Sequence, residues 1–312
     1  MIATTPAAVR ALDKSALTRA HKEDYEKWRF DEGDEIAHGR HAIRLLGGGH
    51  KYEAYLAWDE HLNALVVAKL LRPHLVADES ALRTLKAEVH ALRRLNHPVL
   101  LRCFDTVADG PHPHVVLEFL EGPRLSTLIR KYGPLSFEQA GPLGLQLCSA
   151  LQYMHNESMV HLDVKPRNII MGATPRLIDL SVARTVDEAR RADQPIGTDA
   201  YMAPEQCDPV GYGGMGAAAD VWGWGVTMYE ALTATLPWQP DESERERFPQ
   251  LEADPAPITK PMPVPIVQAL TASLEKRPED RPTPSEVAEM LEPFIAALPR
   301  RPVLTRLRPR LR

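Results

Sequence analysis

The hydrophobic pattern of this 312-residue chain changes near Gly122, and this change restricts its fold more than any other feature. From residue 43 to residue 120, short apolar runs alternate with glycines and polar residues, which is typical of β-strands. The exception is residues 80–95, where leucine and valine recur at helical spacing. Beyond Gly122 the pattern is mainly helical, including a buried helix predicted over residues 217–232. The sequence therefore predicts an α+β fold of two lobes, with a ligand cleft between them.

Composition excludes several classes of protein. The formal charge of −5 argues against a nucleic-acid binder with a global basic field. Cys103, Cys148 and Cys207 are odd in number and widely separated, so neither a disulfide framework nor a zinc site is predicted. No signal peptide and no transmembrane segment of about 20 apolar residues is predicted. We therefore expect a cytoplasmic protein in a reducing compartment.

A polar segment before the apolar residues 169–171 carries the clearest chemical signal. Asp163 is followed by Lys165 and Asn168, and Asp179 ends the next apolar strand. Phosphoryl transfer needs a positioned acceptor, neutralised phosphate charge and a metal clamp. An aspartate can orient a hydroxyl and take its proton, a lysine can touch the phosphate, and asparagine and aspartate oxygens suit Mg²⁺.

Three features upstream fit the same chemistry. Gly47, Gly48 and Gly49 lie between two predicted strands, where backbone N–H groups can approach phosphates closely. Lys69 lies among apolar residues on a later strand, and Glu88 lies beside the apolar stripe of the predicted helix. A buried lysine needs an anionic partner, and Glu88 is the candidate.

The order of these motifs resembles the signature set of protein kinases. Downstream, the chain continues the resemblance with Gly197-Thr198 and a segment ending in Ala-Pro-Glu205, with Asp220-Val-Trp-Gly, and with Arg281, the expected partner of Glu205. Over roughly residues 35–297 the chain resembles the eukaryotic-like (Hanks-type) serine/threonine kinases, particularly the bacterial ones. Lys165 together with Thr198 is similar to the serine/threonine branch rather than the tyrosine branch.

This resemblance implies a bilobal protein-kinase fold and a set of domains. The N-lobe would be a small antiparallel sheet with one helix over about residues 35–117, followed by a hinge at 118–121 and a helical C-lobe at 122–297. Residues 1–34 would form an N-terminal extension and residues 298–312 a disordered Arg/Pro-rich tail. The implied partners are protein substrates with serine or threonine acceptors, a second copy in a homodimer, and an acidic or anionic partner for the tail.

The resemblance also implies roles for the site residues, with ATP and Mg²⁺ as cofactors and Mn²⁺ as a substitute for Mg²⁺. Lys69, fixed by Glu88, would hold the α- and β-phosphates. Asp163 would orient the acceptor hydroxyl, and Lys165 would steady the γ-phosphate. Asn168 and Asp179 would bind the metal. Leu117 would be the gatekeeper beside the hinge. The implied nucleotide site consists of Gly47, Gly48, Gly49, Ala54, Ala68, Lys69, Leu117, Glu118, Leu120, Asn168, Ile170 and Asp179.

The chain departs from the kinase pattern at several positions. Tyr52 replaces the third loop glycine, Leu162 replaces the arginine before the catalytic aspartate, and Leu180 and Ser181 follow the metal aspartate. Leu162 needs no anion, so we expect that phosphorylation of the activation segment is not required. Thr185 is the plausible acceptor there, and ion pairs among the segment's arginines and acids could order it.

Two other functions remain open at this stage. A pseudokinase scaffold would bind ATP with little or no transfer, and the departures favour it weakly. A small-molecule kinase of the aminoglycoside or choline type would share the aspartate and asparagine spacing, but not Lys165 with the Gly-Thr and Ala-Pro-Glu segments. The histidine pairs His38/His41 and His112/His114 are predicted to be solvated rather than metal ligands.

The last 13 residues carry six arginines and no acid. We expect that deleting residues 299–312 leaves catalysis unchanged, because the tail is predicted to lie outside the folded domain. The measurement is the specific activity on a free peptide, alongside binding to anionic liposomes. A large fall in activity on that peptide would contradict this expectation.

Overall fold

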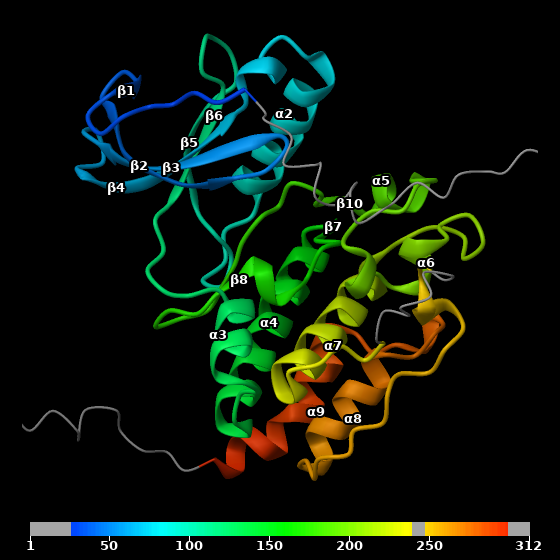
Figure 1. The fold of residues 1–312 in the computed structure, drawn as a ribbon. Helices are drawn as coiled ribbons and strands as arrows, with labels where there is room; N and C mark the ends of the chain where they lie inside the picture. Colours follow the sequence, from blue (N-terminus) through cyan, green and yellow to red (C-terminus); the bar gives the residue numbers. More distant parts are fainter. Residues whose placement is uncertain (1–25, 239–246, 299–312) are drawn as a thin grey trace, which may run out of the picture.

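The computed structural model describes residues 26–238 and 247–298, which form two lobes with a cleft between them (Figure 1). The upper lobe holds a six-stranded antiparallel sheet in the order β1-β2-β3-β4-β6-β5. Its strands are β1 (Glu35–Ala37), β2 (Arg40–Gly48), β3 (Tyr52–Asp59), β4 (Ala64–Leu71), β5 (Cys103–Val107) and β6 (His114–Glu118). Helix α2 (Glu79–Arg94) is the helix of this lobe among the described residues. The predicted two-lobed α+β fold is confirmed.

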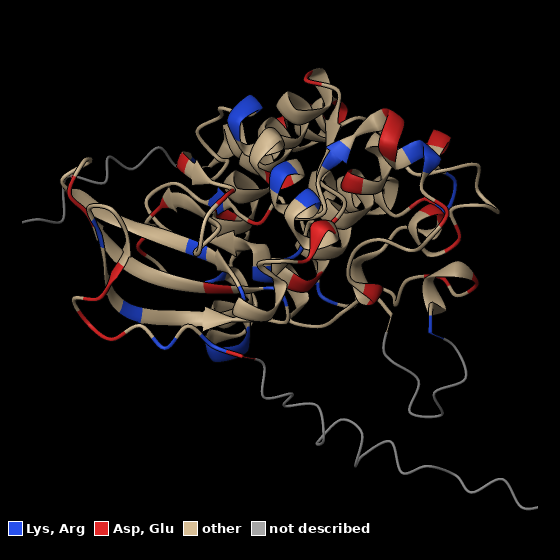
Figure 2. Ribbon diagram, turned by 90° about the horizontal axis from the view of Figure 1, so that it is seen from above, with Lys and Arg blue, Asp and Glu red and all other residues tan. Residues whose placement is uncertain are grey.

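The lower lobe is mainly helical and is built around the buried helix α7. Its helices are α3 (Leu125–Tyr132), α4 (Phe137–Asn156), α5 (Val186–Arg191), α6 (Pro204–Cys207), α7 (Ala217–Thr233), α8 (Val264–Ser273) and α9 (Pro284–Ala297). Two short antiparallel sheets lie in this lobe, and they pair β7 (Met159–Val160) with β10 (Arg184–Thr185) and β8 (Ile169–Ile170) with β9 (Arg176–Leu177). In Figure 2, basic and acidic residues are interspersed on both lobes.

Helix α4 begins at Phe137, although Pro142 lies within it. The backbone N–H of Ser136 donates to the side chain of Gln139, which satisfies one end of a capping box. Pro142 has no N–H to donate, so the helix lacks one backbone hydrogen bond at this position.

Residues 26–34 pack against the sheet of the upper lobe. Trp28 donates its indole N–H to the Leu71 carbonyl at 2.8 Å, and the rings of Trp28 and Phe30 both contact His112 edge-on. Residues 26–30 belong to no helix or strand. The part of the predicted extension that the structure describes is therefore joined to the lobe, while the domain boundaries at residues 34 and 297 stay predictions. The tail of residues 299–312 lies outside the described residues.

Among the four histidines predicted to be solvated, the prediction is wrong for His114. His114 is completely buried, because it is the first residue of β6, which lies between β4 and β5 in the sheet, and it pairs with Leu70. Its ring nitrogens lie 2.7 Å from the His112 carbonyl and 3.3 Å from the Arg40 guanidinium. Within residues 26–238 and 247–298, no group of histidines, cysteines and acids is arranged to hold a metal ion.

A buried ion pair ties α6 to the end of the lower lobe. Arg281 donates from both terminal nitrogens to the two carboxylate oxygens of Glu205, at 2.6 and 2.8 Å. Arg281 also donates to the carbonyls of Ala218, Glu275 and Lys276, and its guanidinium lies over the Trp222 ring. Arg281 thus donates five hydrogen bonds from its three side-chain nitrogens. The guanidinium also packs on the Trp222 ring.

We expect Glu205→Ala to lower the free energy of unfolding by about 3–5 kcal/mol, because it leaves a buried guanidinium without its counter-ion. Denaturant titration of the intact chain measures this loss. The control is Arg83→Ala, which breaks an exposed pair with Glu79 and should cost about 0–1 kcal/mol. Equal losses in the two variants would contradict the expectation.

Candidate active site

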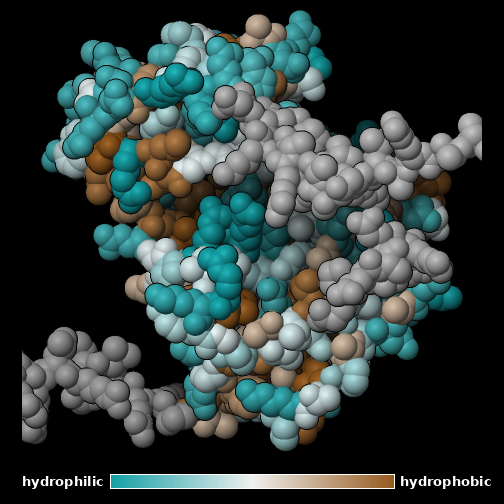
Figure 3. Space-filling view, in the orientation of Figure 1, coloured by the Kyte–Doolittle hydropathy of each residue, from teal (hydrophilic) through white to brown (hydrophobic). Residues whose placement is uncertain are grey.

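The cleft between the lobes has a volume of about 1080 Å³, which is large enough for a nucleotide-sized ligand. Hydrophobic residues gather on the underside of the sheet, above a hydrophilic area of the lower lobe (Figure 3). Most of the predicted site residues line this cleft. They are Gly47, Gly48, Gly49, Ala54, Lys69, Glu88, Leu117, Glu118, Leu120, Lys165, Asn168, Ile170 and Asp179.

Ala68 does not line the cleft, and its predicted contact with the ligand is wrong. Successive side chains of a strand point to opposite faces of the sheet. Because Lys69 faces the cleft, Ala68 faces away, and it lies fully buried in the cluster beneath Trp28 and Phe30. Val67 lies on the cleft face in its place. The alternation along β4 could have identified Val67 from the sequence.

Lys69 is held by one carboxylate from each lobe. Its Nζ lies 2.6 Å from Glu88 Oε1 on helix α2 and 3.3 Å from Asp179 Oδ1 of the lower lobe. Burial alone would lower the pKa of Lys69, but the two carboxylates outweigh it and hold that pKa above its ordinary value. The lysine therefore carries a positive charge in the cleft, at the place where an anionic ligand would need one.

Asp179 keeps its negative charge despite lying in the cleft. Burial would raise its pKa, but the nearby Lys69 ammonium and a hydrogen bond from Ser181 lower it to about 2. Its backbone has a φ of 69°, in the left-handed region that a residue other than glycine rarely adopts. This conformation turns the carboxylate at the end of the strand toward Lys69.

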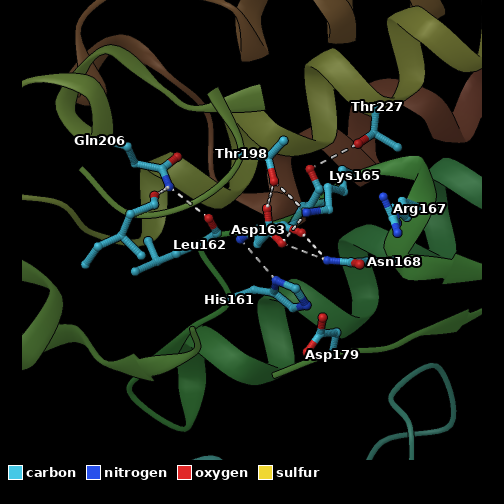
Figure 4. A network of polar contacts seen from close by, with 12 residues as sticks. His161, Leu162, Asp163, Lys165, Arg167, Asn168, Asp179, Thr198, Gln206 and Thr227 are labelled. Atoms are coloured by element: carbon cyan, nitrogen blue, oxygen red, sulfur yellow. Dashed lines mark hydrogen bonds and ion pairs between the residues drawn. The ribbon is translucent and has the colours of Figure 1, made fainter. Parts of the chain in front are cut away.

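Asp163 is the centre of a polar network (Figure 4). Lys165 Nζ lies 2.6 Å from Asp163 Oδ2, and the Thr198 hydroxyl donates to Oδ1 at 2.8 Å. Asn168 donates its side-chain N–H to the Asp163 carbonyl and to Oδ2, at 2.9 and 3.0 Å. The short turn Pro166–Asn168 and the strand β8 after it fix the spacing of these three side chains.

The backbone before Asp163 is fixed by residues distant in sequence. The Asp220 carboxylate accepts hydrogen bonds from the N–H groups of His161 and Leu162, at 2.9 and 2.7 Å. The Gln206 side chain donates to the Leu162 carbonyl at 2.9 Å. Sequence reasoning missed Gln206, because no local pattern relates it to a loop 44 residues earlier.

The activation segment that follows Asp179 is held by backbone contacts. Strand β10 pairs Arg184 with Val160, and the Thr185 hydroxyl accepts from the Glu188 N–H at the start of α5. The expected internal ion pairs are absent: none forms among the segment's six described arginines and acids. These are Arg184, Asp187, Glu188, Arg190, Arg191 and Asp193. Leu162, where many kinases have an arginine, is buried against apolar neighbours at 3% exposure.

Comparison with known proteins identifies the family. The model of the protein kinase domain matches residues 40–293. The serine/threonine-protein kinase PknB of Mycobacterium leprae is 31% identical over 251 residues, which are 76% of this chain and 40% of that protein. The kinase PkaA of Streptomyces coelicolor is 32% identical over 234 residues, 72% of this chain and 42% of that protein.

The chain thus spans about 40% of the length of these relatives. Among the residues that the structure describes, no helix has the length and apolar character needed to span a bilayer. The match covers both lobes and every residue of the polar network around Asp163. This chain therefore belongs to the protein kinase family, among the Hanks-type serine/threonine kinases of bacteria.

Proposed function

We propose that this protein transfers the γ-phosphoryl group of ATP to serine or threonine hydroxyls of other proteins. The observation that carries the proposal is the assembled cleft. Lys69 is paired with Glu88, while Asp163, Lys165 and Asn168 form one network with Thr198. A cleft with these charges in place can bind a nucleotide and position an acceptor without prior rearrangement.

The residues present fit a Mg²⁺·ATP complex. Asp179 is ionised, and Asn168 uses its side-chain N–H group on Asp163, which leaves its carbonyl oxygen for a cation. Oxygen ligands of this kind suit Mg²⁺, which supplies charge neutralisation to the phosphates when it is bound. Lys69 would hold the α- and β-phosphates, and the hinge over residues 118–121 with Val67, Ala54 and Ile170 would surround the adenine.

Asp163 would orient the acceptor hydroxyl and take its proton. Asp163 is not among the residues that line the cleft, but it adjoins Lys165 and Asn168, which do line it. Lys165 and Thr198 hold its two carboxylate oxygens, so the orientation of the carboxylate is fixed. Lys165 lies close enough to serve both Asp163 and an incoming γ-phosphate as a cation. The protein substrate, a homodimer and an anionic partner of the Arg-rich tail stay predictions.

We expect Lys69→Met and Asp179→Asn each to lower the transfer rate by about 10²–10³ while the fold is kept, because each removes a main electrostatic contributor. Radiolabelled ATP with a generic protein substrate measures the rate, and thermal unfolding checks the fold. Lys86→Met, at an exposed lysine of α2, is the matched control and should keep the rate. Activity within a few-fold of the original in either site variant would contradict the assignment.

The same assay distinguishes an active kinase from a pseudokinase scaffold. A scaffold of this fold would bind ATP in a Mg²⁺-dependent manner and transfer no phosphate to any protein substrate. Because Lys69, Glu88, Asp163, Asn168 and Asp179 are all present, we favour the enzyme.

We expect Thr185→Ala to keep most of the initial rate after phosphatase treatment. Leu162 is buried and apolar, so the position before Asp163 carries no cation that a phosphate on the activation segment would neutralise. The substitution should cost about 1 kcal/mol of stability, because Thr185 caps α5. A ten-fold or larger loss of rate that Thr185→Glu restores would show that the segment is switched by phosphorylation.

A further inference from the structure

Tyr52 has an unusual place in the nucleotide cleft. It is the first residue of β3, where other kinases have the third glycine of the phosphate loop. It lies on the same face of the strand as Ala54, which pairs with Lys69 of β4. The centroid of its ring lies 4.6 Å from Lys69 Nζ. The ring therefore covers the lysine from the side of the loop, in cation–π contact.

Two buried atoms beside Lys69 lack partners. Tyr52 Oη and Glu88 Oε2 are both buried and, in the part of the chain that the structure describes, neither forms a hydrogen bond. The other carboxylate oxygen of Glu88 is already bound to Lys69. A phenol hydroxyl donates and a carboxylate oxygen accepts, so the two atoms are complementary. Leaving each of them buried and unpaired is costly, which favours their contact.

The surroundings of Tyr52 favour the protonated form of its phenol. Burial, and after it the negative charge of Glu88, raises the pKa of Tyr52 well above its ordinary value, although Lys69 acts in the opposite direction. The side chain is thus a hydrogen-bond donor next to an acceptor that has one free oxygen. A phenolate at this place would be repelled by Glu88 and Asp179.

We propose that Tyr52 is a positioning residue for phosphoryl transfer, which donates its hydroxyl hydrogen to Glu88 Oε2 and shields the Lys69 ammonium with its ring. The proposal rests on the proposed kinase function. Lys69 is held by Glu88 on one side and covered by Tyr52 on the other. The start of β3, and with it the phosphate loop, is joined through Glu88 to helix α2, so loop and helix reach the phosphate-binding arrangement together.

The test uses two substitutions at this position and one on the opposite face of the same strand. Tyr52→Phe keeps the ring and removes the hydroxyl, and Tyr52→Leu removes both. Tyr55→Phe is the matched control, because Tyr55 is buried on the face beneath Phe30, away from the cleft. We expect Tyr52→Phe to lower kcat/KM for ATP about ten-fold, Tyr52→Leu to lower it further, and both to leave the KM for the peptide unchanged.

A double-mutant cycle identifies the partner. In the Glu88→Gln background, Tyr52→Phe should lower kcat/KM for ATP by less than about two-fold, because the charged acceptor is already gone. Equal effects of Tyr52→Phe in the two backgrounds would overturn the proposed contact. A rise in activity in Tyr52→Leu would overturn it too, since the ring would then obstruct the phosphates.

Hydrogen exchange gives a readout that needs no catalysis. Amides of α2 (Glu79–Arg94) should exchange faster in Tyr52→Phe than in the unsubstituted protein or in Tyr55→Phe, because one link between loop and helix is lost. Unchanged exchange would overturn the proposal. If the unsubstituted protein transferred no phosphate, the kinase function would fail, while this exchange measurement would still decide the role of Tyr52.

Discussion

The geometry of the site depends on one buried carboxylate. Asp220 is 1% exposed, yet it accepts two backbone hydrogen bonds from the loop before Asp163, and its Oδ2 lies 2.9 Å from the His155 ring nitrogen. Burial would raise its pKa, but the contacts with His155 outweigh this and hold it below the ordinary value. Because Asp220 lies in the first turn of the buried helix α7, the loop that carries Asp163 is fixed to the interior of the lower lobe.

The two lobes meet through charge at the cleft. Lys69 of the sheet contacts Asp179 of the lower lobe, and Glu118 in the hinge region lies 3.4 Å from Arg176 of β9. One apolar cluster also spans both lobes, since it includes Leu85 and Leu117 of the upper lobe together with Leu147 of the lower one. Apolar packing therefore joins the lobes beside the ion pairs at the cleft.

The sequence predicted the lobes and most cleft residues because kinase motifs are local and lie in a fixed order. Its failures have physical causes. Ala68 was misplaced because the alternation along β4 was not applied, and Val67 takes its position. His114 was predicted to be solvated, but pairing within the sheet buries it. The contact of Gln206 with the Leu162 carbonyl and that of Tyr52 with Lys69 depend on tertiary packing, which no local pattern contains.

The packing of residues 26–30 bears on how the phosphate loop is supported. The backbone N–H of Trp28 donates to the carboxylate of Glu53 in β3, at 3.1 Å, and Glu53 pairs with Arg72. Arg72 in turn donates to the carbonyl of Gly49 in the phosphate loop. A protein cut at residue 40, where the family match starts, would lose the cover of a buried ion pair that supports this loop. Arg72 also donates to the carbonyl of Glu26, so residues upstream of the family's boundary help to hold the ion pair that supports the phosphate loop.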